Sequence, residues 1–90
     1  MKKFVFLGEA FRAKAQSIVI EFMESHPECR STGNGLKKSE IFRYCGLDWG
    51  EKEKATSSNQ QYWIVALLRE LAEENMVEQV RESGPWRLKS

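Results

Sequence analysis

NQQYWIVALLRELAEENMVEQV, residues 59–80, decides the fold, because its pattern is that of a helix followed by a strand. Its apolar residues recur at spacings of three and four, which places them on one side of an α-helix. Asn75 is a residue type that favours the left-handed conformation found where helices end. A serine upstream, Ser57 or Ser58, is suited to cap the beginning of the helix. The predicted buried face consists of Ile64, Leu67, Leu68 and Leu71.

The residues after this helix predict a two-stranded hairpin. Residues 76–81 form the first predicted strand, residues 83–85 the turn, and residues 86–88 the return strand. Successive side chains of a strand point to opposite faces. The return strand therefore has Trp86 and Leu88 on one face, and Arg87 and Lys89 on the other.

Two further helices are predicted upstream. The first should run from about residue 8 to residue 25, because the residue before Pro27 is disfavoured in a helical conformation. The second should cover about residues 37–45, with Gly46 as its end, and Leu36 just before it is placed to pair briefly as a strand. The apolar face predicted for the first helix is Phe11, Ala15, Ile18 and Phe22, widened by Val19 and Met23.

The N-terminal segment is predicted to lie outside the main domain. FVFL, residues 4–7, is either a short strand or the beginning of an arm, so we expect residues 1–8 to be an arm or strand beside a single domain of residues 9–90. The segment opens like a signal peptide, but its apolar run is too short and Glu9 and Arg12 follow at once. Because no apolar run approaches the length of a membrane span, we expect a cytoplasmic protein without membrane partners.

The composition excludes several classes of protein. Ninety residues make one domain, and 41% hydrophobic with 30% charged residues is typical of a globular chain rather than a disordered one. No Gly-rich phosphate loop, metal-ligand cluster or nucleophile–base group is present, so the sequence predicts no enzyme, no cofactor and no metal site. Cys29 and Cys45 are expected to be reduced thiols, with a disulfide or redox switch as the alternative.

Three helices followed by a basic hairpin is the element order of a winged helix. LKKSEIFRYCGL (36–47) resembles the second helix of such domains, and IVALLRELAEENMVEQV (64–80) with GPWRL (84–88) resembles the third helix and the wing. The pattern is most similar to the winged helix appended to the nuclease domain of some methyl-directed restriction endonucleases, and to related domains of Mrr-type enzymes. Asn75 departs from the Gly common there, and the chain has no room for a nuclease domain. The resemblance implies an α+β winged helix that binds duplex DNA without catalysis.

The charges of the third helix fit this function only if its beginning meets the DNA. Residues 59–80 carry one Arg and four carboxylates, and the carboxylates lie toward the end of the helix. A recognition helix presents its N-terminal residues to base edges, and amides such as Asn59 and Gln61 pair well with adenine, although capping and solvated surface are their ordinary roles. The predicted DNA contacts are Ser58, Asn59, Gln61, Tyr62 and Arg69 on the third helix, Lys37, Lys38 and Arg43 on the second, and Arg81, Arg87 and Lys89 on the wing.

Two interpretations of function follow. The first is a small DNA-binding protein that acts as a regulator of transcription or as an accessory protein of a mobile or defence element. Because a lone domain covers little DNA, we expect it to act as a homodimer formed through residues 1–8 or together with a partner protein. The second is a protein-interaction module on the same fold, which the net charge of +1 favours. Residues 1–54 carry ten Lys and Arg against eight Asp and Glu, and residues 55–90 carry four against five. This asymmetry is too small to decide between them. The acidic residues offered to a basic partner are Glu70, Glu73, Glu74 and Glu78.

Overall fold

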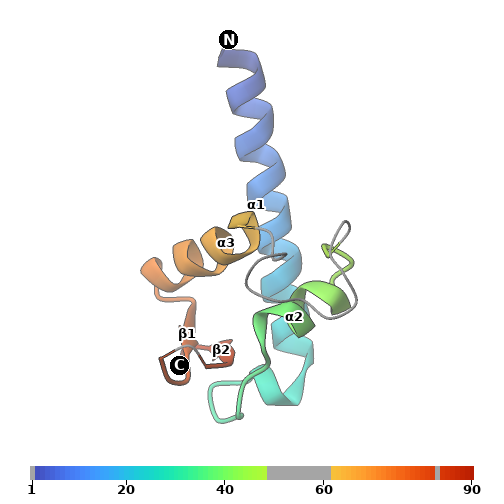
Figure 1. Cartoon of the computed structure of the whole chain (residues 1–90). Coiled ribbons are helices and arrows are strands. Elements are labelled where there is room, and N and C mark those ends of the chain that lie inside the picture. Colours follow the sequence, from blue (N-terminus) through green and yellow to red (C-terminus); the bar gives the residue numbers. More distant parts are fainter. Residues whose placement is uncertain (1, 49–61, 83) are drawn as a thin grey trace.

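Three α-helices and a two-stranded antiparallel sheet make up the computed structural model, which describes residues 2–48, 62–82 and 84–90 (Figure 1). The chain is therefore α+β, and the elements follow one another in the predicted order. The helices are α1 (Lys2–Ser25), α2 (Lys38–Tyr44) and α3 (Tyr62–Glu73), with the 3-10 turn η1 (Pro27–Cys29) after α1, and the strands are β1 (Val77–Gln79) and β2 (Trp86–Leu88).

Helix α1 begins at Lys2, so residues 2–8 do not form the strand that was one of the two predictions for this segment, and the first helix begins earlier than the predicted residue 8. Residues 4–7 continue the helix because no neighbouring strand in the described chain offers them backbone partners, and a lone strand would leave its polar groups unpaired. The helix ends at Ser25 as predicted. At that end His26 Nδ1 accepts a hydrogen bond from the backbone N–H of Glu28 at 3.2 Å, which begins η1.

The face of α1 that enters the core is only part of the predicted one. Ala15, Val19 and Met23 are its buried residues, whereas Phe11 is 58% exposed. The reason is visible in Figure 1: the first half of α1 projects beyond the other elements, so Phe11 has no neighbouring element to pack against. The second half supports the domain. The buried hydrophobic core of the described residues is Ala15, Val19, Met23, Cys29, Ile41, Phe42, Leu47, Leu67, Leu68, Leu71, Val77 and Trp86.

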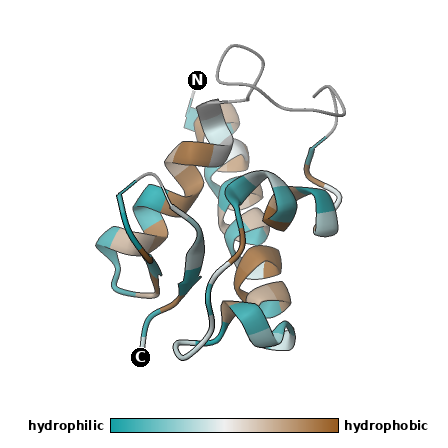
Figure 2. Ribbon diagram, turned by 60° about the horizontal axis from the view of Figure 1, so that its bottom comes forward, coloured by the Kyte–Doolittle hydropathy of each residue, from teal (hydrophilic) through white to brown (hydrophobic). Residues whose placement is uncertain are grey.

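Helix α3 follows its sequence pattern closely. Leu67, Leu68 and Leu71 are buried, as predicted, and hydrophilic residues alternate with them along the ribbon (Figure 2). Asn75 has the predicted left-handed conformation, with φ of 62°. Its N–H donates to the carbonyl of Ala72 and that of Met76 donates to Leu71, both at 3.0 Å, which is the hydrogen-bond pattern of a Schellman cap. This cap ends the helix and turns the chain into β1.

The hairpin is shorter than predicted. Its register pairs Val77 with Leu88 and Gln79 with Trp86. The N–H of Val80 still donates to the carbonyl of Pro85 at 2.8 Å, but Pro85 has no N–H to donate in return, so the ladder ends there. On the other side of β2, Leu36 and Trp86 exchange backbone hydrogen bonds of 2.9 and 2.8 Å, which confirms the predicted short strand pairing at Leu36.

The loop before Leu36 packs closely on its own beginning. A Cβ at Gly33 would lie 2.4 Å from the carbonyl oxygen of Glu28, a distance that no side chain tolerates. The N–H of Gly35 donates to the same oxygen at 2.7 Å. The glycines therefore allow a tight loop whose last residue pairs with β2.

Both cysteines are free thiols, as predicted. Cys29 is fully buried at the end of η1, and burial raises its thiol pKa from the ordinary value of 9.0 to about 11, with Glu28 adding to the effect. Cys45 is half-buried, and burial raises its thiol pKa as well.

The Cys29 thiol predicts a loss of stability at high pH. Above pH 9.0 the unfolded chain releases this proton while the folded chain keeps it up to about pH 11, so the free energy of unfolding should fall across that interval. Urea titrations at several pH values measure the fall, and Cys29→Ala should reduce its slope while lowering stability at neutral pH. Parallel pH profiles for the two proteins would contradict the assignment.

Candidate nucleic-acid interface

An open groove of about 600 Å³ lies between the beginning of α2, one side of α3 and the tip of the hairpin. Four cationic side chains and one carboxylate, Glu82, are among the residues that line it. Cations from three separate elements therefore converge on one surface, although the chain as a whole is nearly neutral. The cationic residues are Lys37, Lys38, Arg69 and Arg81, and the other lining residues are Ser39, Val65, Gln79, Gly84, Pro85 and Trp86.

Lys37 and Lys38 are placed by the anchoring of α2. Ile41 and Phe42 on this helix are fully buried in the core, so the first turn of the helix is fixed beside the hairpin. Glu40 completes the turn, because its Oε1 accepts a hydrogen bond from the backbone N–H of Lys37 at 3.3 Å. The Lys37 side chain is exposed, and that of Lys38 is half-buried.

Arg69 comes from the outer side of α3. Ala66, Arg69 and Glu73 are exposed, on the side of the helix away from the buried Leu67, Leu68 and Leu71. Trp63 is half-buried and packs at the rim of the core, where its ring and that of Phe42 meet in an edge-to-face contact with centroids 5.7 Å apart.

Arg81 is positioned by the turn of the hairpin. The backbone N–H of Gly84 donates to the carbonyl of Arg81 at 2.8 Å, and Gln79 Nε2 donates to the carbonyl of Gly84 at 2.9 Å. The turn is thus closed from both strands, with the exposed Arg81 side chain at its edge. Gln79 lies directly across from Trp86 and lines the same groove, a role that the sequence did not indicate because the strand register was unknown.

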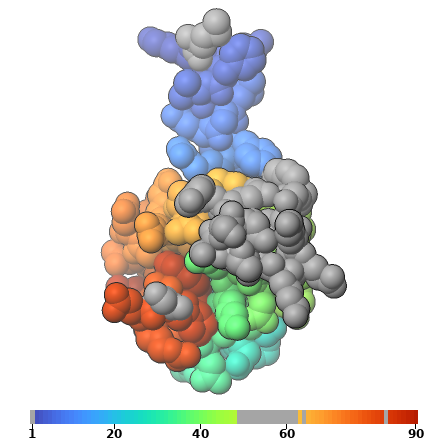
Figure 3. Space-filling model, viewed as in Figure 1, coloured from blue at the N-terminus to red at the C-terminus, as the bar shows by residue number. Residues whose placement is uncertain are grey.

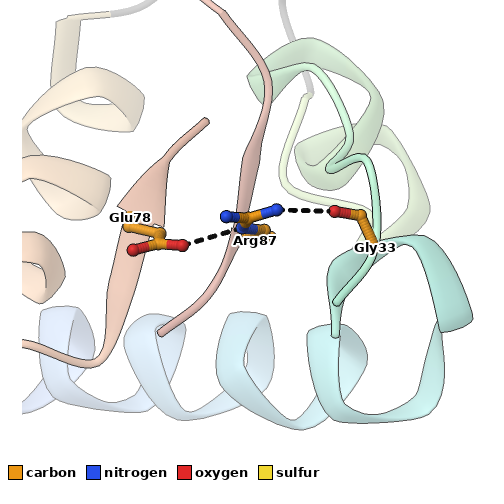
Figure 4. Close-up of polar contacts among 3 residues, drawn as sticks. All are labelled: Gly33, Glu78 and Arg87. Carbon is orange, nitrogen blue, oxygen red and sulfur yellow. Dashed lines mark hydrogen bonds and ion pairs between the residues drawn. The ribbon is translucent and has the colours of Figure 1, made fainter. Parts of the chain in front are cut away.

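Arg87 and Lys89 make other contacts. Arg87 Nε donates to Glu78 Oε2 at 2.7 Å, and Arg87 Nη1 donates to the carbonyl of Gly33 at 2.9 Å (Figure 4). Since Glu78 and Arg87 are cross-strand partners, their side chains lie on the face of the hairpin opposite to that of Trp86. Lys89 Nζ donates to Asn75 Oδ1 at 3.2 Å. Neither cation lines the groove.

The remaining predicted contacts lie away from the groove or outside the described residues. Arg43 is in the last turn of α2, where its Nε is 3.9 Å from Asp48 Oδ2. Tyr62 is the first described residue of α3. Ser58, Asn59 and Gln61, and the predicted cap at the beginning of the third helix, fall in the segment 49–61, which is outside the described residues.

The carboxylates of α3 are not among the residues that line the cationic groove. Glu73 and Glu74 are exposed near the end of the helix, and Glu70 lies 4.0 Å from the Nε atom of Arg12 on α1. None of the three lines the groove. Arg69 nevertheless lies beside two of them, because it also lines a second hollow together with Glu70 and Glu73.

No protein-family model, curated protein or solved structure matches the chain. Within residues 2–48, 62–82 and 84–90, no group of three or more His, Cys, Asp and Glu side chains is arranged to hold a metal ion. Across the same ranges no helix is both long and apolar enough to cross a membrane.

Proposed function

We propose that the protein is a winged helix that binds duplex DNA through the groove between α2, α3 and the hairpin. The observation that carries the proposal is the convergence of Lys37, Lys38, Arg69 and Arg81 on that groove, opposed there by one carboxylate. Lys and Arg side chains gathered on one face neutralise phosphates and displace counterions, which supplies most of the affinity of such proteins for DNA.

In the proposed complex, the outer face of α3 lies in the major groove and the hairpin lies on the backbone. Ala66 is small, so the helix can approach the bases closely, while Arg69 reaches a phosphate. Lys37, Lys38 and Arg81 contact phosphates on either side and set the orientation without specifying sequence. Base recognition is assigned to Asn59 and Gln61, which precede Tyr62 in the sequence.

The biological role that fits such a domain is a small cytoplasmic regulator of transcription or an accessory protein of a mobile or defence element. We assign it no catalytic step. A protein-interaction module is the second candidate, favoured by a different observation: the projecting half of α1 exposes several large apolar side chains.

Binding to a labelled duplex of about 20 base pairs should be detectable at micromolar protein in low salt, and it should weaken steeply from about 50 to 200 mM salt. Lys38→Ala and Arg81→Ala should each lower the slope of log affinity against log salt by about one, because each removes one phosphate contact. Fluorescence anisotropy measures both effects.

Arg30→Ala is the matched control, because it removes the same charge from an exposed residue that does not line the groove. It should leave the slope unchanged. Absence of binding at low salt, or an equal loss of slope in all three variants, would refute the proposed interface.

A further inference from the structure

The first half of α1 is an unpartnered helix with an unusually apolar surface. It projects from the domain in Figures 1 and 3, and every residue from Lys2 to Lys14 is exposed. Phe4 is 65% exposed, Val5 62% and Phe6 68%. Contiguous exposed apolar groups of this kind mark interaction sites in soluble proteins.

One side of this projecting helix combines two apolar residues with a cation at the tip of the helix and a carboxylate two turns further along. Lys2, Val5, Phe6 and Glu9 line a shallow hollow, and they are spaced at i, i+3, i+4 and i+7, which places them on a single side of the helix. Lys3 is adjacent at its tip. We call the side defined by Lys2, Val5, Phe6 and Glu9 the arm face.

The second half of α1 lines an acidic groove. It lies between α1, the end of α3 and Met76, with a volume of about 480 Å³. Ile20, Leu71 and the exposed Met76 supply apolar surface. Three carboxylates, those of Glu21, Glu24 and Glu74, are among the lining residues, and none of the lining residues is basic.

We propose that this acidic groove receives the arm face of a second copy of the chain, and that the contact is reciprocal. The apolar residues Val5 and Phe6 of each arm would cover the apolar surface of the other copy's groove, while Lys2 and Lys3 would meet its carboxylates. The result is a homodimer held by two antiparallel α1 helices. Unlike an extended arm or strand, the contact uses helical residues on both sides.

The spacing along α1 makes this arrangement self-complementary. At about 100° per residue, Lys2, Phe6, Ala13, Ile20 and Glu24 all fall on one stripe of the helix. An antiparallel pair with its twofold axis at Ala13 sets Phe6 opposite Ile20 and Lys2 opposite Glu24. Because Ala13 is small, the two helices can approach closely at the axis. An isologous contact of this kind closes at two copies rather than forming chains.

The proposed contact extends along the whole of α1, and it leaves the cationic groove free. Twenty-four helical residues extend over about 36 Å, so two paired α1 helices present a long interface, and specific interfaces bury roughly 1,200–2,000 Å² in total. None of the residues that line the acidic groove lines the groove assigned to DNA. Dimerisation is therefore independent of the proposed function.

Light scattering coupled to size exclusion tests the proposal on the full chain without DNA. We expect a mass of twice 10.5 kDa at micromolar concentrations. Phe6→Asp should shift the protein to 10.5 kDa, and because Phe6 is 68% exposed the substitution leaves the fold intact, which circular dichroism verifies. Phe4→Asp is the matched control, since Phe4 is equally exposed but lies on the other side of the helix, and it should leave the dimer unchanged.

A charge exchange tests the orientation of the two helices. Lys2→Glu and Glu24→Lys should each weaken the dimer about tenfold by placing like charges together at two symmetric contacts, and the double variant should restore the affinity. A wild-type monomer at high concentration, equal dissociation by the Phe4 and Phe6 variants, or a double variant weaker than both single ones would overturn the proposal.

Discussion

Phe42→Ala is expected to lower the free energy of unfolding by about 3–5 kcal/mol. Phe42 has no exposed surface and is the largest of the fully buried side chains. Its ring makes an edge-to-face contact with that of Trp63, which joins α2 to α3. Truncation removes its apolar burial and leaves a cavity that these two helices cannot readily fill. A domain of this size has a total stability of roughly 5–15 kcal/mol, so the variant should be close to unfolding.

Urea denaturation followed by circular dichroism measures this loss. Phe4→Ala provides the matched control, because the same atoms are removed from a side chain that is 65% exposed, and its effect should stay within about 0.5 kcal/mol. Similar midpoints for the two variants would mean that Phe42 does not anchor α2. Since Lys37 and Lys38 depend on that anchoring, the groove assigned to DNA would then lose its physical basis.

The sequence predicted those elements whose determinants are local. The buried face of α3 and the left-handed Asn75 were predicted because periodicity and the helix end are encoded within one stretch of residues. The beginning of α1 was not, because a run of four apolar residues fits a strand and a helix equally well. The buried face of α1 depends on which of its residues have a neighbouring element, and this cannot be predicted from the local sequence around Phe11.

The same limit applies to the candidate interface. Lys37, Lys38 and Arg69 were among the predicted contacts and line the groove, because their positions on two helices follow from the sequence pattern. Arg81 was also among them, because the predicted turn of the hairpin follows it in the sequence. Gln79 was missed because only the strand register shows that it lies opposite Trp86. A shift of one residue sends a strand side chain to the other face, so the composition of the hairpin alone does not distinguish a cation that lines the groove from one that supports the fold.

Arg87 and Arg81 show this distinction, and their alanine variants should behave in opposite ways. Arg87→Ala is expected to lower the free energy of unfolding by about 1–3 kcal/mol, because it leaves Glu78 and the carbonyl of Gly33 without their charged donor. The side chains of Arg87 and Glu78 are only about a third exposed, so water replaces the lost hydrogen bonds poorly. Arg81→Ala removes an exposed side chain and should change stability by less than about 0.5 kcal/mol.

The order reverses for DNA. Arg81→Ala should lower the salt dependence of binding by about one, while Arg87→Ala, measured where it is fully folded, should leave it unchanged because its guanidinium is held between β1 and the loop at Gly33 (Figure 4). Denaturation and anisotropy on the same two proteins separate the effects. A normal stability with a reduced slope in Arg87→Ala would show that this guanidinium leaves Glu78 to bind phosphate, and the hairpin would then present its other face to DNA.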